Sequence, residues 1–141
     1  MKKYLNIAFA YLLAGLAGGV FFREFTKFNA FTGVTALGFL HVHLLVLGMV
    51  VFLLVALFSH VLPLERQKAF RPFLIVYNIG LPFTVAMLAV RGVCEVLNTP
   101  LSAGANAAIS GLAGIAHILL SLGLILLFSA LRRAAAEAET H

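Results

Sequence analysis

The chain has 141 residues, of which 62% are hydrophobic and 11% are charged, and its mean hydropathy is +1.07. Soluble domains carry about 25% charged residues, so these few charges could not cover the surface of a water-soluble globule of this size. The net charge of +5 comes from Lys and Arg that separate apolar runs rather than forming one basic patch, which argues against nucleic-acid binding. The composition predicts a membrane protein.

Four uncharged runs follow one another along the chain, and their bounds are Tyr4–Phe22, Val34–Phe58, Phe73–Val90 and Ala107–Leu131. Each is close to the roughly 20 residues that a helix needs to cross about 30 Å of hydrocarbon. Short connections make neighbouring helices antiparallel. We therefore expect one all-α domain, residues 1–141, folded as an integral membrane four-helix bundle in up-down-up-down order.

The distribution of Lys and Arg predicts how the bundle is oriented. The two ends of the chain and the loop between the second and third runs hold seven of these residues, and the other two loops hold three. Because positive charge is retained on the cytoplasmic side, we expect both termini in the cytoplasm. The predicted location is the bacterial inner membrane, with lipid around a multi-pass protein.

Small and weakly polar residues recur at helical spacing in every run, as expected where membrane helices approach each other. For the glycines and serines, a packing role is the simplest interpretation. The fourth run aligns Ser110, Gly114, His117 and Ser121 on one face. The third run adds Tyr77, Asn78, Pro82 and Thr84.

Three histidines lie inside the runs: His41 and His43 in the second, and His117 in the fourth. An ionisable side chain within a membrane span is costly and indicates function by default. His43 is ten residues beyond Gly33 and His117 is twelve beyond Ala105, a difference in depth of about 3 Å. The second and fourth helices run parallel, about 14 Å apart across a bundle. That gap suits two imidazoles with a metal and a flat macrocycle between them.

Only one of the two neighbouring histidines can face that gap, because residues i and i+2 on a helix point about 200° apart. Gly38 and Gly48 clear space on the face of His41, whereas depth favours His43 as the partner of His117. Both remain candidates. The predicted cofactor is haem b, with His117 and either His41 or His43 as axial ligands.

The alternatives are a zinc or copper site and histidines that only hydrogen-bond to carbonyls or serines. A zinc or copper site is short of ligands, since the chain has no Asp and its runs contain no Glu or Cys. A haem also needs positive charge near its propionates. Arg23 and Arg91 lie on the same side of the membrane as His41 and His43, although Arg91 could instead be an interface anchor paired with Glu95.

The stretch GFLHVHLLVLGMV, residues 38–50, resembles the His-x-His helix of haem-copper oxidase subunit I and of related nitric oxide reductase and NnrS-type proteins. Together with GGVFFREFTKFNAFTG, residues 18–33, it resembles a family of small bacterial four-span proteins that we group with that superfamily. The resemblance implies haem ligands at His41 and His43 that face two different haems. It also implies a propionate contact at the position of Arg91.

The oxidases' further copper-site histidines and their linked tyrosine have no counterpart, so terminal oxidase activity is not expected. Because oxidase subunit I has twelve helices in three arcs of four, the resemblance implies a homo-oligomer, a trimer or a dimer.

Our leading interpretation is a haem protein acting in electron transfer or in haem or gas sensing. The alternative is a small transporter of metal ions or solutes, in which Tyr77, Asn78 and Thr84 join the histidines and Pro82 interrupts a helix. A third interpretation is an assembly subunit without chemistry of its own.

Overall fold

The structure is a computed structural model, and it describes residues 1–139. These residues form helices and connecting turns, with no strand among them. The elements are α1 (Lys2–Phe28), α2 (Leu37–Val42), the π-helix η1 (His43–Val50), α3 (Val51–Val61), the 3-10 turn η2 (Leu64–Arg66), α4 (Phe70–Val96) and α5 (Ala103–Glu139). The all-α prediction is confirmed.

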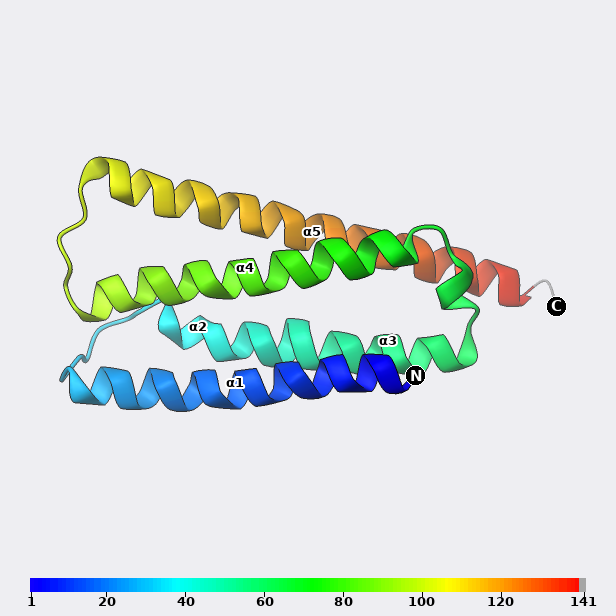
Figure 1. The fold of residues 1–141 in the computed structure, drawn as a ribbon, viewed down its shortest axis with the longest axis horizontal. Coiled ribbons are helices and arrows are strands. Elements are labelled where there is room, and N and C mark those ends of the chain that lie inside the picture. Colours follow the sequence, from blue (N-terminus) through cyan, green and yellow to red (C-terminus); the bar gives the residue numbers. More distant parts are fainter. Residues whose placement is uncertain (140–141) are drawn as a thin grey trace.

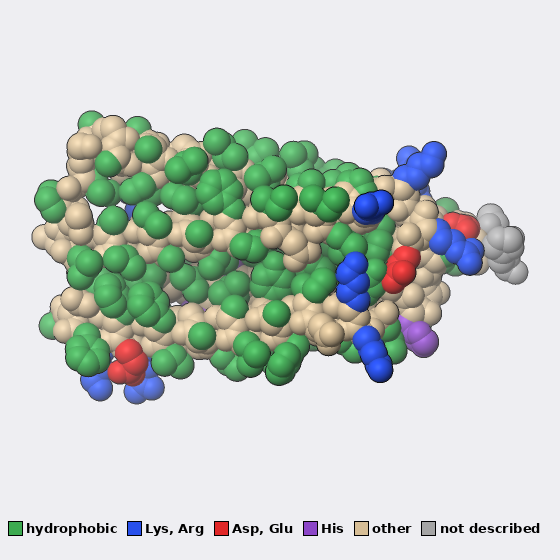
Figure 2. Space-filling view, viewed as in Figure 1, with side chains coloured by type: hydrophobic (Ala, Val, Ile, Leu, Met, Phe, Trp, Pro, Cys, Tyr) green, Lys and Arg blue, Asp and Glu red, His purple; other side chains and the backbone are tan. Residues whose placement is uncertain are grey.

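Within residues 1–139, four helices are long and apolar enough to cross a membrane: α1, the continuous helix Leu37–Val61, α4 and α5. We call Leu37–Val61, which comprises α2, η1 and α3, the second long helix. The chain therefore has the character of a multi-pass membrane protein, as its composition predicted. Charged side chains collect towards the two ends of the molecule, and hydrophobic side chains cover the region between them (Figure 2).

The helices extend beyond the uncharged runs because their charged ends are helical as well. The second long helix is the exception, since it begins at Leu37 rather than at Val34. At its start the Ala36 N–H donates to Glu95 Oε2 at 2.7 Å, and the Leu37 N–H donates to Thr35 Oγ1 at 3.3 Å. The first N–H groups of a helix have no partner within it, and here side chains satisfy two of them.

Successive long helices run in opposite directions (Figure 1). α1 packs along the second long helix, whose first half also contacts α4, and the most extensive contact is between α4 and α5. Close approach of α4 and α5 requires glycine: a Cβ on Gly80 would stand 2.7 Å from the backbone nitrogen of Leu120. Small residues at helix crossings are typical of membrane proteins.

The main core lies in the part of the bundle that includes the N-terminus. Phe52, Phe73 and Tyr77 are fully buried there, and each of these rings lies within 6.1 Å, centroid to centroid, of the other two. Tyr4 and Phe70 continue the same cluster. A smaller core of Leu37, Leu40, Leu44 and Val96 joins the second long helix to α4 at the other end of the molecule.

Candidate functional site

The start of the second long helix is fixed against the end of α4, and this sets the positions of the histidines that follow. Thr35 Oγ1 donates to the Gly92 carbonyl at 3.1 Å. A Cβ on Gly92 would lie 2.5 Å from the backbone nitrogen of Leu37, so only glycine allows this contact. The docking of α2 places His41 and His43 a short distance along the helix.

His41 and His43 face different helices, as their spacing requires. The His41 ring stacks on Phe22 of α1, with ring centroids 6.2 Å apart and an interplanar angle of 15°. Its Nδ1 is buried without a hydrogen-bond partner among the described residues. A Cβ on Gly19 would be 3.7 Å from the His41 ring, so this glycine leaves room for the imidazole. His41 therefore lies against α1 and away from His117.

His43 and His117 lie next to each other. Their ring centroids are 6.4 Å apart and their planes are nearly perpendicular, at 87°. His43 Nδ1 is 2.8 Å from the Phe39 carbonyl oxygen, and His117 Nδ1 is 2.8 Å from the Ala113 carbonyl oxygen. A carbonyl oxygen only accepts, so each Nδ1 carries the proton. In the neutral imidazole the Nε2 lone pair of both residues is then available, which is the usual state of a metal-binding histidine.

The distance between these two rings matches two imidazoles on opposite sides of one metal ion. A metal–nitrogen bond of about 2.0 Å plus about 1.1 Å from nitrogen to ring centre places the two centroids about 6.2 Å apart. No group of three or more His, Cys, Asp or Glu within residues 1–139 could hold a metal ion. Among the described residues the pair therefore offers two protein ligands without a third beside them.

The π-helical segment η1 begins at His43. π-Helical turns are rare and occur frequently at functional sites. Inside this segment the Leu47 carbonyl accepts a hydrogen bond from Tyr77 Oη at 2.7 Å, which satisfies it from α4. This π-helical segment could not be predicted from the sequence, because an apolar run such as HLLVLGMV has no feature that separates π from α geometry.

Arg91 reaches from α4 to α5. Its Nη1 donates to Asn106 Oδ1 and its Nη2 to Ser110 Oγ, the second at 2.7 Å. Ser110 precedes His117 by seven residues, or about 10 Å along the helix axis. The alternative partner Glu95 instead accepts from the Ala36 N–H. Asn106 was not among the residues predicted from the sequence, although it lies four residues before Ser110 on the same face of α5.

Arg23 is placed differently. Its side chain is 80% exposed, and its nearest carboxylate is that of Glu24, at 3.8 Å from Nε. A long ion pair between exposed groups contributes little to stability. Of the two arginines expected near a cofactor, Arg91 is therefore the one that contacts the helix carrying His117.

The first part of α5 is open around His117. The buried residues of this helix begin at Ala116, and His117 itself is exposed. A Cβ added at Gly111 or Gly114 would meet nothing within 4 Å. Gly114 lies one turn before His117 on the same face, so no side chain of the described residues crowds the helix surface at that turn.

The polar residues of α4 do not line a common path. Tyr77 and Thr84 are fully buried, and Thr84 Oγ1 donates to the Gly80 carbonyl of its own helix at 2.9 Å. Asn78 is only partly buried and accepts a hydrogen bond from Tyr11 Oη at 3.0 Å. Tyr77 and Asn78 thus contact different neighbouring elements, η1 and α1.

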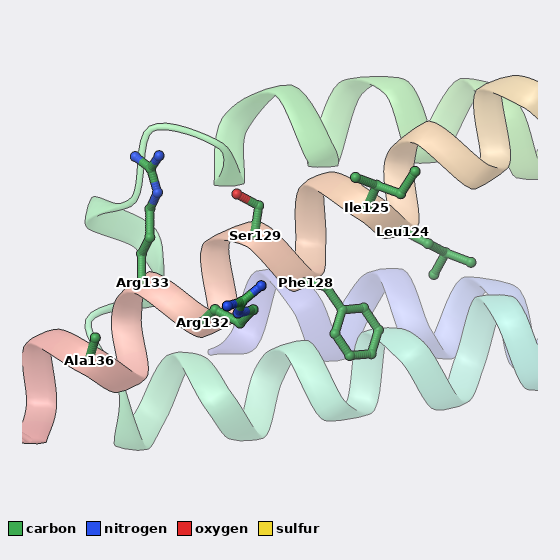
Figure 3. Close-up of a pocket in the computed structure, with 7 residues that line it drawn as sticks. All are labelled: Leu124, Ile125, Phe128, Ser129, Arg132, Arg133 and Ala136. Atoms are coloured by element: carbon green, nitrogen blue, oxygen red, sulfur yellow. The ribbon is translucent and has the colours of Figure 1, made fainter.

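A cavity of about 620 Å³ lies along the far third of α5 (Figure 3). Its lining is apolar apart from Ser129, Arg132 and Arg133, and the two arginines extend from the helix in different directions. It contains no His, Cys, Asp or Glu. Arg side chains beside apolar residues are typical of the membrane–water interface, where their stems cover apolar surface. This cavity therefore lacks the chemistry found at His43 and His117.

Comparison with known proteins corrects one expectation. No curated protein and no solved structure matches the chain. The predicted relationship to haem-copper oxidase subunit I, nitric oxide reductase and NnrS-type proteins is wrong, because the family match is to a different family. A thirteen-residue motif with two histidines in an apolar helix was too short to establish a family relationship. The expectation of an oxidase-like trimer rested on that relationship and no longer has support. Residues 1–134 match the family described as "Protein of unknown function (DUF2871)", and the chain belongs to that family.

Proposed function

We propose that the chain is a b-type haem-binding protein of the bacterial inner membrane, with His43 and His117 as the axial ligands of one haem iron. Electron transfer, or sensing of haem or a gas, is the role that such a site would serve. The observation that carries the proposal is the pair of adjacent imidazoles, 6.4 Å apart, each with Nδ1 bonded to a carbonyl of its own helix.

A site with only two protein ligands is better suited to a haem than to a metal ion without a porphyrin. A haem would bring the porphyrin nitrogens as iron ligands of its own, so His43 and His117 would be enough to hold it. Structural zinc needs four ligands, and within residues 1–139 no third His, Cys, Asp or Glu joins the pair. The open space at Gly111 and Gly114 would admit a flat macrocycle beside α5.

Arg91 supports the same arrangement. A haem whose iron lies at the level of His117 would extend its propionates along α5 towards Ser110, where the Arg91 guanidinium already lies. Charge-assisted hydrogen bonds from Arg to carboxylate are strong. The excess of Lys and Arg at both termini and in the loop between α3 and α4 favours cytoplasmic termini, which puts this arginine near the outer surface.

The test is the absorption spectrum of purified, haem-supplied protein in its oxidised and reduced forms. We expect a Soret band in both forms. The spectrum of the reduced protein should be that of six-coordinate haem. His43→Leu or His117→Leu should each remove one axial ligand, shift the band and lower the haem content. His60→Leu is the matched control, because His60 is exposed at the far end of α3.

His41→Leu separates the two neighbouring histidines. With His43 as the ligand, this variant keeps the wild-type spectrum. A spectrum unchanged by both His43→Leu and His117→Leu, or protein that takes up no haem, would overturn the proposal. Zinc or copper bound without porphyrin would favour the transporter alternative instead.

A further inference from the structure

The cavity beside Arg132 and Arg133 adjoins an apolar groove between α3 and α5. Leu124 and Phe128 line both spaces, and α3 forms the opposite wall of the groove. The groove has a volume of about 250 Å³, and every side chain that lines it is apolar. Leu124 precedes Arg132 by eight residues, or about 12 Å along the helix axis. The combined surface is therefore basic at one end and apolar along the rest.

The positive charge at this end has no counter-charge among the described residues. No carboxylate of residues 1–139 forms an ion pair with Arg132 or Arg133. Glu137 lies one turn beyond Arg133 on α5, but its Oε2 accepts a hydrogen bond from Gln67 Nε2 at 2.8 Å. Ser129 adds a hydroxyl group one turn before Arg133. The two arginines extend in different directions and both border the cavity, so an anion inside it would have positive charge on two sides (Figure 3).

These arginines come directly after the apolar part of α5. The uncharged run ends at Leu131, so both guanidinium groups lie where a spanning helix leaves the hydrocarbon. The excess of Lys and Arg favours the cytoplasm for this end of the chain. The cytoplasmic leaflet is the one whose surface is made negative by anionic lipids, and basic pockets between helices on that side bind lipid head groups.

We infer that an anionic phospholipid binds here, with its phosphate in the cavity between Arg132 and Arg133 and one acyl chain in the groove between α3 and α5. The guanidinium groups and the Ser129 hydroxyl would donate hydrogen bonds to the phosphate oxygens. A zwitterionic lipid would bring a cationic group beside the arginines, and a free phosphate ion would leave the groove unfilled. The binding requires no haem, since no histidine lines either space.

The experiment is native mass spectrometry of the full-length protein in a neutral detergent, titrated with dioleoyl phosphatidylglycerol or dioleoyl phosphatidylcholine. We expect the anionic lipid to bind about tenfold more tightly than the zwitterionic one. Arg132→Gln and Arg133→Gln should each weaken its binding about fivefold, or about 1 kcal/mol per charge near the membrane surface. Lys2→Gln and Lys3→Gln are the matched controls, because they remove the same charge from exposed side chains at the start of α1.

The contribution of the acyl chain is tested with Phe128→Ala. This substitution should weaken binding of the anionic lipid about threefold by loss of van der Waals contacts. Phe9→Ala is its control, because Phe9 is 59% exposed on α1, Phe128 is 63% exposed, and the cavity that Phe9 lines contains no charged residue. Glycerophosphoglycerol, which is the same head group without acyl chains, should not displace the lipid even in excess.

Three results would overturn the inference. They are equal binding of the two lipids to the wild type, equal losses in the arginine and lysine variants, and displacement of the lipid by glycerophosphoglycerol. The first would leave the groove to any acyl chain, the second would assign the effect to the overall charge of this end, and the third would leave a site for the anion alone. The Soret band of each sample is recorded as well, so haem binding and lipid binding are scored separately.

Discussion

The two ends of this bundle are built differently. The aromatic half, defined by Tyr4, Phe52, Phe70, Phe73 and Tyr77, buries every one of these rings. The histidine half, defined by His41, His43, Arg91 and His117, leaves each of these side chains at least partly accessible. α5 takes part in both, and it is buried only from Ala116 onwards.

The difference shows how a small membrane protein can combine a tightly packed core with a candidate ligand site. Lipid is as apolar as a leucine side chain, so tight packing rather than burial holds the helices together. The aromatic half supplies that packing. The first part of α5 is then free to leave space beside its histidine. If this division is right, a bulky substitution should affect stability in one half and ligand binding in the other.

Gly80→Ala should produce the largest effect on the fold. Its Cβ would meet the backbone of Leu120 at 2.7 Å, and a backbone cannot move aside as a side chain can. We expect a loss of about 1–3 kcal/mol in the free energy of unfolding, measured by reversible denaturation in mixed micelles. Gly111→Ala is the matched control in the histidine half, and it should leave the free energy of unfolding unchanged or raise it slightly. Equal losses in the two variants would refute the division.

Gly114→Leu tests whether a bulky side chain in the histidine half affects ligand binding rather than stability. The new side chain would occupy the space beside His117, where a Cβ now meets nothing within 4 Å. We expect unfolding free energy to change by about 0.5 kcal/mol or less. Haem uptake should fall below about a tenth of the wild-type value, which corresponds to a loss of more than about 1.4 kcal/mol in the free energy of haem binding. It is measured as the Soret absorbance per protein.

Arg91→Gln should weaken haem binding about fivefold, since the proposed charge-assisted contact to a propionate would become a neutral hydrogen bond. Haem transfer to apomyoglobin measures this change. Arg23→Gln is the control, because the Arg23 side chain is 80% exposed and its ion pair is with Glu24 of its own helix. A larger effect of Arg23→Gln would move the propionates to the α1 side of the bundle.

Tyr77→Phe should have the smallest effect of the four substitutions. It removes the hydrogen bond to the Leu47 carbonyl and leaves the ring packed against Phe52 and Phe73. Single hydrogen bonds within membrane bundles contribute about 0.6 kcal/mol on average. A loss of that size in unfolding free energy, with an unchanged haem spectrum, would show that the bond stabilises η1 without shaping the site.

The sequence predicted the helices well because charge and hydropathy are local properties. Fifteen charged residues, confined to the ends of four apolar runs, were enough for the all-α fold and the four long helices. The histidines stood out for the same reason, since an imidazole in an apolar run is conspicuous. A relationship to the oxidases could not be established from one helix. Two histidines separated by one residue in an apolar helix are too short a pattern to identify a family.

By itself, then, the sequence determined the number of helices, their apolar character and the short list of His41, His43, His117, Arg23 and Arg91 as candidates. Only the tertiary structure decided which of them meet: His43 beside His117, His41 against Phe22, and Arg91 on Asn106 and Ser110. The reason is that composition acts residue by residue. Which faces of two helices meet depends instead on contacts far apart in the chain, such as Gly92 with Leu37 and Gly80 with Leu120, which set how each helix lies against its neighbour.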